Sequence, residues 1–419
     1  MQASLDLASR GLRVYLVEKS PSIGGRMAQL DKTFPTMDCS ICIVAPKMIE
    51  CLRHPNITLL TYCELKEINR SAGNFSVKIL RKPRFVDEEK CTGCGICAQN
   101  CPVEIPNEFD MDLGIRKAIY IPLPQAVPLK YTIDDEHCLR CGLCQKVCGT
   151  GAVNLNQKPQ TLTLSVGAII IATGFELFDA RARSEYGYGR YRNVLISLEF
   201  ERLLSASGPT GGHLLRLSDG RIPRRIAFVQ CVGSRSLKGG VPFCSTACCM
   251  YATKEAILIR EHEPECQVTV FYNELRVFGK GYQDFVNKAK DHWGVKYVRG
   301  LPGEIVEDPK TGDLALWYED TTENVTKSIE ADIVVLCPAL IPRETSKELS
   351  FLLGLELDEH GFFKAKDPLF APVDTNVPGI FICGYCQSPK DIPESVGQAS
   401  AAAARAAEVI ASSVDEEVH

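Results

Sequence analysis

Cysteine is the residue type in this chain best suited to redox and metal chemistry, and it occurs 20 times among 419 residues. Two runs, CTGCGICAQNCP and CLRCGLCQKVCG, share the spacing C-x2-C-x2-C-x3-C and begin 47 residues apart. Bacterial ferredoxins bind [4Fe–4S] clusters with this spacing, and the first run also has the proline that follows the fourth cysteine. The two runs therefore predict two [4Fe–4S] clusters.

Each predicted cluster takes ligands from both runs. The first three thiolates of a run cap three irons of one cube, and the fourth, expected on a helix, reaches the other cube. The predicted sets are Cys91, Cys94, Cys97 with Cys148, and Cys138, Cys141, Cys144 with Cys101. A zinc ribbon also uses C-x2-C pairs, and other cysteines are plain core residues, but neither alternative explains two triple-spaced runs. Gly149 replaces the second proline, which leaves the thiols intact.

Four further cysteines occupy the place where a nucleotide-binding fold has its phosphate loop. The segment CVGSRSLKGGVPFCSTACCMYATKEA, residues 231–256, follows the apolar run RIAFVQ. A pyrophosphate needs glycines and the free amides of a helix N-terminus, whereas thiolates repel it. Cys231, Cys244, Cys248 and Cys249 can instead surround a third cluster, provided that the adjacent pair lies in the first turn of a helix. The alternative is that two of the four are packed core thiols.

Composition restricts the class of protein that positions these thiols. Hydrophobic residues make up 45% of the chain and charged residues 24%, with a net charge of −5, which is ordinary for a globular protein. No basic patch indicates a nucleic-acid partner. The longest apolar run is too short for a membrane span, and the first residues lack the pattern of a signal peptide. We therefore expect a cytoplasmic protein whose cysteines are thiols or metal ligands.

The hydrophobic pattern predicts two dinucleotide-binding units around the cysteine runs. An alanine-rich helix over 2–11 and a buried strand over 13–19 form the second half of a βαβ unit ending in Glu18. An acidic residue at that position holds ribose hydroxyls, although the sequence shows neither the preceding strand nor its G-x-G-x-x-G loop. The strand over 167–174 is expected to belong with the strand over 13–19, and a second βαβ unit is expected over 225–274.

Motifs along nearly the whole chain resemble the A-subunit family of heterodisulfide reductase. They are VYLVEKSPSIGGRMAQLDKTFPTMDCSICIVAPKM, CTGCGICAQNCP, PLPQAVPLKYTID, QCVGSR, FCSTACCMYATKEA and CQSPKDIPESVGQASAAAA. The resemblance implies an α/β fold, a thioredoxin-reductase-like flavoprotein core of two dinucleotide-binding domains with an inserted α+β two-cluster ferredoxin domain. It also implies FAD and a further [4Fe–4S] cluster on the third cysteine quartet, three clusters in total. The family's longest members have an N-terminal extension and a second ferredoxin unit that this sequence lacks.

The elements and the resemblance together predict the domain limits. The FAD-binding domain is expected over 1–82, 158–215 and 341–419, with a ferredoxin domain inserted over 83–157 and a second Rossmann-like lobe over 216–340. The predicted FAD contacts are Glu18, Lys19, Gly24, Gly25, Arg26, Met27, Ala172, Thr173, Gly174, Gly384 and Gln398. The glycines allow close backbone approach to the cofactor.

Three residues are candidates for a catalytic role. In the family a lysine of the YATK stretch lies near the flavin N5, so the resemblance implies that Lys254 stabilises anionic reduced flavin; the alternative is an exposed helix lysine. Cys39 and Cys42 form a C-x2-C pair in a region where disulfide reductases of similar architecture have a redox pair; the alternative is simple packing. The cysteines expected in the core are Cys51, Cys63, Cys266 and Cys337.

The resemblance implies an oxidoreductase subunit that relays electrons between partner subunits and can split electron pairs between two acceptors. Expected partners are the other subunits of a heterodisulfide-reductase-type complex, a hydrogenase- or dehydrogenase-linked donor and ferredoxin, with a homodimer within the complex left open. Two alternatives are a flavin-free iron–sulfur wire and an NAD(P)H oxidoreductase with a fused ferredoxin, as in glutamate synthase small subunits. The thiols in the second lobe argue against the last.

Overall fold

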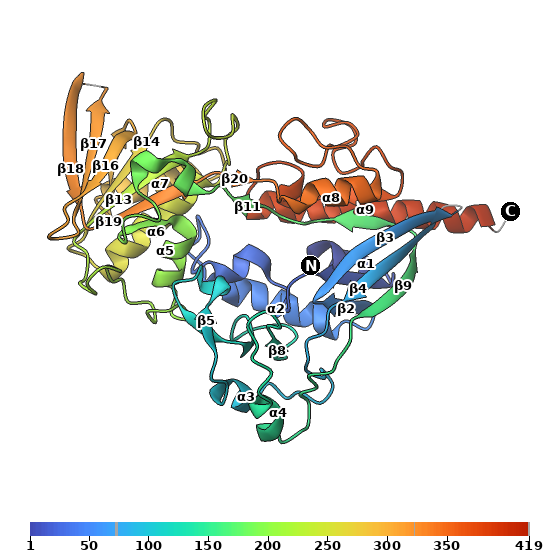
Figure 1. Cartoon of the computed structure of the whole chain (residues 1–419). Helices are drawn as coiled ribbons and strands as arrows, with labels where there is room; N and C mark the ends of the chain where they lie inside the picture. The colour runs from blue at the N-terminus through green and yellow to red at the C-terminus, as the bar shows by residue number, and fades with distance from the viewer. Residues whose placement is uncertain (72–73, 322, 418–419) are drawn as a thin grey trace.

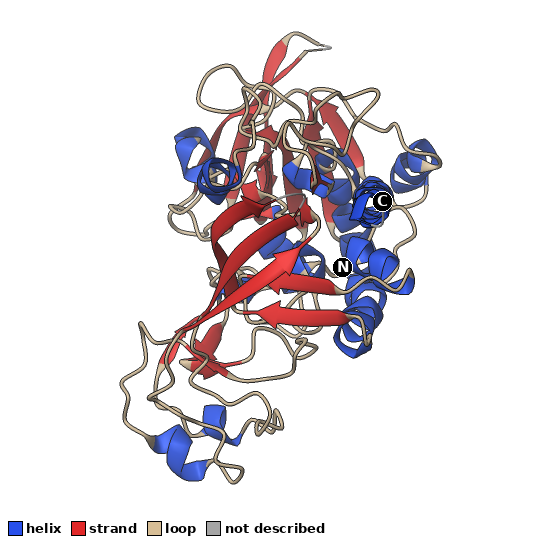
Figure 2. Ribbon diagram, turned by 90° about the vertical axis from the view of Figure 1, so that its right-hand side faces the viewer, coloured by secondary structure: helices blue, strands red, loops and turns tan. Residues whose placement is uncertain are grey.

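The computed structural model describes residues 1–71, 74–321 and 323–417, arranged in three groups of elements. Figure 1 shows a lobe with β13, β14 and β19 at one side, a lobe with β3, β4 and the long helix α9 at the other, and an irregular lobe with α3 and α4 below. In the turned view of Figure 2 this lower lobe projects away from the other strands and consists mostly of loops. Within the described ranges, no helix is both long and apolar enough to cross a bilayer.

The N-terminal elements follow the helix–strand pattern that the sequence predicts. Strand β1 (Val14–Glu18) pairs in parallel with β2 (Ile57–Thr61). The segment between them contains the turn η1 (Gly25–Gln29) and helix α2 (Ser40–Arg53). Helix α1 (Gln2–Ser9) packs against this layer, because apolar residues of α1, α2 and β2 share one buried cluster.

A second parallel pair joins a strand from the middle of the chain to a strand near its C-terminus. Strand β10 (Ile169–Ile171) pairs with β21 (Ile380–Ile382). The strand over 167–174 is expected to belong with the strand over 13–19 in one domain, and within the described residues no ladder joins β10 directly to β1. Helix α9 (Ile392–Glu417) lies against both strands and α1. Its buried Ala402 and Ala403 have side chains small enough for such close packing.

The cysteine-rich segment is inserted between neighbouring strands. Strands β3 (Cys63–Ser71), β4 (Asn74–Arg81) and β9 (Gln160–Val166) form an antiparallel sheet in which Arg81 lies opposite Gln160. The chain therefore leaves and re-enters the sheet at adjacent positions, which makes the insertion compatible with the sheet. The short elements of the insert are α3 (Ile96–Gln99), β5 (Glu104–Pro106), η2 (Glu108–Asp110), β6 (Ile115–Lys117), β7 (Ile119–Tyr120), β8 (Thr132–Ile133) and α4 (Leu143–Val147).

The second lobe is built on a parallel sheet with the strand order β12-β19-β13-β14-β15. Its strands are β12 (Val194–Ile196), β13 (Arg225–Val232), β14 (Gln267–Tyr272), β15 (Lys296–Arg299) and β19 (Ile333–Pro338), and its helices are α5 (Ser197–Leu204), α6 (Cys248–His262) and α7 (Tyr282–Asp291). Every residue of β19 is buried, as expected for a parallel strand covered on both faces. An antiparallel sheet of β16 (Pro302–Glu307), β17 (Leu314–Asp320) and β18 (Val325–Ala331) shares an apolar cluster with one face.

The start of the second lobe differs from the prediction, which assigns residues 158–215 to the FAD-binding domain. Strand β12 hydrogen-bonds to β19, and α5 contacts the same strand. All three residues of β12 are buried and complete the edge of the second sheet. The local pattern does not reveal this long-range pairing, so the predicted limit at 215 is too late.

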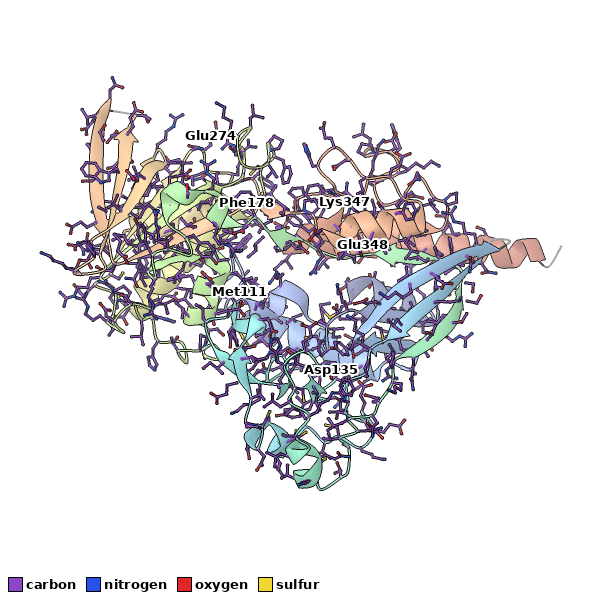
Figure 3. The ribbon with its side chains drawn as sticks, viewed as in Figure 1. Met111, Asp135, Phe178, Glu274, Lys347 and Glu348 are labelled. Atoms are coloured by element: carbon purple, nitrogen blue, oxygen red, sulfur yellow. A yellow bond between two sulfur atoms is a disulfide. The ribbon has the colours of Figure 1, made fainter. Side chains whose placement is uncertain are left out.

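Two chain segments connect the first and second lobes, and they lie side by side. Strand β11 (Glu176–Leu177) leads into the second lobe, strand β20 (Leu340–Ile341) leads out of it, and the two pair antiparallel. Phe178, labelled in Figure 3, continues from β11 and donates its backbone N–H to Ala339 O. The remaining elements are the turns η3 (Ala180–Ala182), η4 (Ser184–Tyr186) and η5 (Gly384–Cys386) and helix α8 (Thr345–Leu353).

Candidate cofactor sites

The two ferredoxin-type runs adopt the same local backbone conformation. Gly93 and Arg140, which are equivalent in the repeat, have φ angles of 74° and 51°, and Gly95 and Gly142 have φ angles of 84° and 77°. The second pair begins α3 and α4 in the left-handed region, where glycine carries no steric penalty. The two runs thus form loops with matching backbone turns.

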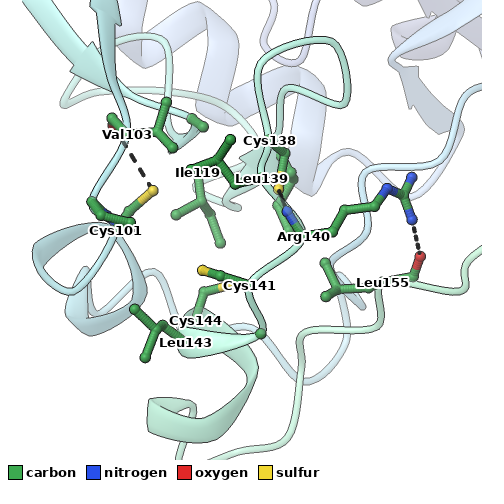
Figure 4. A pocket seen from close by; sticks show the side chains of 14 residues that line it. Cys101, Val103, Ile119, Cys138, Leu139, Arg140, Cys141, Leu143, Cys144 and Leu155 are labelled. Atoms are coloured by element: carbon green, nitrogen blue, oxygen red, sulfur yellow. Dashed lines mark hydrogen bonds between the residues drawn. The ribbon is translucent and has the colours of Figure 1, made fainter.

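One predicted ligand set lines a single pocket in the insert. Its walls contain all four cysteines of the second set, Cys101, Cys138, Cys141 and Cys144. Figure 4 shows their sulfur atoms around this space, with Cys101 arriving from the other run. The Cys138 thiol also accepts a hydrogen bond from the Arg140 N–H at 3.4 Å. These residues fit a [4Fe–4S] cluster with the predicted exchange of the fourth ligand.

Cys91, Cys94 and Cys97 of the first predicted set lie close enough to interact electrostatically. Burial, with repulsion from Cys91 and Cys94, raises the pKa of Cys97 to about 12. Cys148 packs against the apolar cluster of the insert and accepts a hydrogen bond from the Ala152 N–H at 3.3 Å. Cys101 and Cys148 lie just beyond the ends of α3 and α4, and not on the helices as expected, because each helix is only about one turn long.

The four cysteines of the second lobe converge where β13 ends and α6 begins. Burial and repulsion from Cys249 and Cys244 raise the pKa of Cys231 to about 11. Burial also raises the pKa of Cys248, with further repulsion from the other three thiols. The adjacent pair opens the first turn of α6, which is the condition the sequence sets for both to bind. Buried thiols with raised pKa values need a positive partner to ionise, and bound iron supplies one.

In the loop between Cys231 and α6, Gly233 packs against Phe178 and leaves no room for a side chain at that position. A Cβ atom on Gly233 would lie 2.3 Å from the ring of Phe178, and Gly233 itself has a φ of 74°. The backbone N–H groups of Thr246 and Arg276 donate to the thiols of Cys244 and Cys249, each at 3.4 Å. Such hydrogen bonds tune the potential of a cluster. Within the described residues, no three His, Cys, Asp or Glu side chains converge tightly enough for one metal ion.

The predicted FAD segment after β1 forms a tight turn with polar groups turned inward. Gly24 has a φ of 123°, and a Cβ there would lie 3.1 Å from the Cβ of Ala28. The Arg26 guanidinium donates to Gln29 Oε1 at 2.9 Å, whereas its buried Nε has no hydrogen-bond partner. Met111 of the insert, labelled in Figure 3, accepts a weak contact from Arg26 at 3.8 Å. An unpaired buried donor beside a glycine turn fits a phosphate or flavin oxygen.

Three other predicted FAD contacts make only local interactions, and these interactions do not indicate a cofactor. The Glu18 carboxylate at the end of β1 accepts hydrogen bonds from the N–H and hydroxyl of Ser20, at 2.8 and 2.7 Å. Lys19 lies 4.0 Å from Glu64 and is mostly exposed. The Met27 carbonyl accepts a hydrogen bond from the Ser40 hydroxyl at 2.7 Å.

The two later parts of the predicted FAD site meet at the ends of β10 and β21. Thr173, between Ala172 and Gly174, has a buried hydroxyl with no hydrogen-bond partner. Gly384, with a φ of 76°, donates its N–H to Gln398 Oε1 at 2.8 Å, which brings two predicted contacts together. These strand ends therefore offer an orphaned hydroxyl and a glycine turn, a combination that fits a flavin ribityl chain.

Lys254 is buried, so the alternative of an exposed helix lysine is wrong. Its side chain is 1% exposed and forms an ion pair with the equally buried Glu201 of α5. Glu201 also accepts the N–H of Asp31 at 3.0 Å, which connects α6 to the segment that follows the predicted FAD turn. Burial lowers the pKa of Lys254 to about 8, against the opposing effect of Glu255 and Asp31.

Cys39 and Cys42 form a disulfide bond at the start of α2. Cys39 is the N-cap of this helix, and its sulfur accepts the N–H of Cys42 at 3.3 Å. The pair can therefore exist in an oxidised state in this fold. Of the cysteines expected in the core, Cys51, Cys63, Cys266 and Cys337 are all buried.

The sequence alone did not identify three buried polar residues near these sites. Glu201 pairs with Lys254, Glu255 follows Lys254 on α6, and Tyr385 donates its hydroxyl to Ser245 O at 3.3 Å and Leu340 O at 3.2 Å. The adjacent charges of KEAILI, followed by an apolar run, were an available signal for Glu255. Glu201 had no comparable signal, because its partner lies 53 residues away.

Comparison with known proteins supports the cluster segments. A family model described as "4Fe-4S binding domain" matches residues 84–107 and 131–154, which contain both cysteine runs. The chain therefore carries ferredoxin-type [4Fe–4S] binding segments.

Similar proteins cover nearly all of the chain. The iron-sulfur A-subunit of the CoB–CoM heterodisulfide reductase of Methanocaldococcus jannaschii is 53% identical over 96% of this chain and 61% of its own length. The second of two such A-subunits of Methanopyrus kandleri is 54% identical over 100% of this chain and 65% of its own length. The A-subunit of a ferredoxin/F(420)H(2)-dependent CoB–CoM heterodisulfide reductase of Methanosarcina acetivorans is 41% identical over 98% and 52%, respectively. The chain thus spans between about half and two thirds of these relatives.

Solved structures establish the fold. The thioredoxin reductase of T. acidophilum matches 99% of this chain and 94% of its own, at 16% identity and a TM-score of 0.50. That of Lactococcus lactis matches 99% and 95%, at 16% identity and a TM-score of 0.51. The expected α/β fold, thioredoxin-reductase-like with a ferredoxin insert, is confirmed.

Proposed function

The chain belongs to the A-subunit family of heterodisulfide reductase, and we propose that it is the electron-relaying subunit of a heterodisulfide-reductase-type complex. In this role it holds FAD and three [4Fe–4S] clusters on the residue sets described above. It acts as an oxidoreductase subunit that supplies electrons toward a disulfide of the CoB–CoM type named for its relatives. The FAD-binding domain, the insert over 83–157 and the second lobe each hold one part of the relay.

The observation that carries this proposal is the position of the third cysteine quartet. Tyr385 follows the predicted FAD contact Gly384, and its hydroxyl donates to the carbonyl of Ser245, the residue after Cys244. Cys248 and Cys244 act electrostatically on the same hydroxyl. The quartet therefore lies next to the turn that fits the flavin, as a direct electron connection requires.

The residues around the flavin turn have definable tasks. Gly24 and Gly384 permit close backbone approach, and the unpaired Arg26 Nε and Thr173 hydroxyl can hold polar atoms of the cofactor. Lys254 places a cation between α5 and the FAD turn, where it favours a negative charge on a bound group. When bound, FAD supplies the step between two-electron and one-electron chemistry.

The second lobe has the sheet of a nucleotide-binding domain without its phosphate site. Cys248 and Cys249 occupy the N-terminus of α6, where a pyrophosphate binds in such folds. Phe178 and the Gly233 turn fill the neighbouring space. Electrons are therefore proposed to enter through iron and not from a nicotinamide.

The partners and the splitting of electron pairs also belong to this proposal. The ferredoxin insert projects away from both lobes (Figure 2), which suits exchange with a ferredoxin or with another subunit. The disulfide of Cys39 and Cys42 is a candidate redox pair at the start of α2. We assign the role of donor to a hydrogenase- or dehydrogenase-linked protein of the complex, and we leave a homodimer as one arrangement within it.

A visible spectrum together with metal analysis of anaerobically purified protein tests the proposal. We expect resolved flavin bands over a broad iron–sulfur absorbance, and about 12 irons per chain from three four-iron clusters. Iron–sulfur absorbance without flavin bands would support the flavin-free wire instead. Zinc in place of iron would overturn the proposal.

A further inference from the structure

Glu255 of α6 is a buried carboxyl group that no side chain or backbone group of the described residues hydrogen-bonds. Its side chain is 0% exposed, and neither carboxylate oxygen has a hydrogen-bond partner among the described residues. Leaving a buried polar group unpaired destabilises a fold, and a buried charge does so strongly. A redox or catalytic role is one reason for which native proteins keep such groups. Nothing in the fold of α6 itself requires a carboxylate here.

The position of Glu255 connects it to the third cysteine quartet. Cys248, Tyr251 and Glu255 are spaced i, i+3 and i+7, so they form one stripe along α6. At 1.5 Å per residue, Glu255 lies about 10 Å along the helix from Cys248. The Cys337 thiol of β19 faces the same stripe, since both Glu255 and Cys248 act on it electrostatically.

We propose that Glu255 takes up a proton when the cluster held by the cysteine quartet is reduced by one electron. This inference rests on the proposed function, which places the third cluster at the quartet. A low-potential donor, such as reduced flavin or reduced ferredoxin, loses one electron to the cluster iron. One proton from solvent then forms an O–H bond with the Glu255 carboxylate, so that the buried region gains no net charge.

The groups around Glu255 support this assignment. Burial raises the pKa of Glu255, and the neighbouring Lys254 opposes the rise. Lys254 is itself paired with Glu201 of α5, so its charge is shared. The Tyr251 hydroxyl interacts with Cys248, Cys337 and Ser197 at longer range than a hydrogen bond.

The other elements packed on α6 bring little further charge. From α7 the buried residues are apolar except Tyr282, whose hydroxyl donates to Asp391. Gln230 of β13 does not titrate, and Asp31 acts on Lys254. An added negative charge about 10 Å away in a medium of low dielectric therefore raises the pKa of Glu255 further.

Potentiometric titration of the holoprotein, followed by electron paramagnetic resonance (EPR) between pH 5 and 10, tests the inference. The potential of the third cluster should be constant where Glu255 is protonated in both redox states. The potential should fall as the pH rises through the folded-state pKa of Glu255. The largest expected slope is a tenfold change in the ratio of reduced to oxidised cluster per pH unit, which is about 59 mV for one electron. Glu255→Gln keeps the shape and removes the titration, so its potential should not vary with pH.

Two controls separate this role from a structural one. Glu261→Gln changes a carboxylate on the last turn of the same helix, near Lys32. In this variant the potential of the third cluster should vary with pH as it does in the wild type. Infrared difference spectra on dithionite reduction should show a new protonated-carboxyl band in the wild type that is lost in Glu255→Gln. Equal slopes and equal bands in wild type and Glu255→Gln would overturn the inference alone. An iron content of about 8 per chain in the wild type would remove the third cluster and overturn both proposals.

Discussion

The ferredoxin insert and the cysteine quartet of the second lobe both bring together thiols that can bind an iron–sulfur cluster, but they do so in different ways. In the insert, each loop of three thiols comes from one short run with repeated backbone angles. In the second lobe, Cys231 comes from the end of β13, whereas Cys248 and Cys249 come from the start of α6. The insert depends on local spacing, and the quartet depends on the packing of a βαβ unit. Changes in tertiary packing should therefore affect the second site more than the first.

A single substitution in the second lobe is expected to remove one whole cluster. Cys248→Ser should remove about four of about 12 irons, because a serine oxygen is a poor ligand for iron–sulfur iron. The two clusters of the insert should remain, since their eight cysteines lie in another lobe. Iron and sulfide analysis with low-temperature EPR measures this.

The matched control for this change is Cys337→Ser, which alters a buried thiol beside Cys248 that is not in the quartet. It should keep all the irons. An unchanged iron content in Cys248→Ser would show that the quartet is packed core and would remove the comparison between the two regions.

A pair of double variants tests the exchange of ligands inside the insert. Cys101 lines the same pocket as Cys141, although it belongs to the other run. Cys101→Ser with Cys141→Ser should therefore lose about four irons, the same as either change alone. Cys101→Ser with Cys94→Ser should lose about eight, because two clusters are affected. The reverse pattern of iron loss would assign each cluster to a single run.

Neither NADH nor NADPH should reduce the isolated holoprotein at a useful rate. Cysteines hold the helix N-terminus that would bind the pyrophosphate, and thiolates repel it. Anaerobic mixing with each nucleotide, followed at the flavin and iron–sulfur bands, measures this. Dithionite serves as the positive control. Rapid bleaching by either nucleotide would show that the second lobe retains a nucleotide site.

A smaller effect, on the free energy of unfolding, is expected from the ion pair that joins the insert to α5 of the second lobe. Arg202 of α5 is 1% exposed and contacts Asp110 of the insert at 2.9 Å. Arg202→Met leaves that carboxylate without its partner and should destabilise the protein by about 3–5 kcal/mol. Lys364→Met breaks an exposed pair with Glu356 and should cost about 0–1 kcal/mol. Urea unfolding under anaerobic conditions compares the two variants.

The sequence by itself determined the parts of this protein that depend on local spacing. The eight cysteines of the insert, the strand and helix around Cys231 and Cys248, and the α/β class follow from short patterns, because loops and buried strands are encoded by neighbouring residues. The strand over 13–19 was also predicted at nearly its observed limits, Val14–Glu18.

Only the tertiary structure decided which distant residues meet. It paired β10 with β21, placed β12 in the second sheet, and buried Lys254 against Glu201. It also left the Glu255 carboxylate without a hydrogen-bond partner. Strand order and buried charge pairs arise from contacts between residues far apart in the chain, so no local pattern records them.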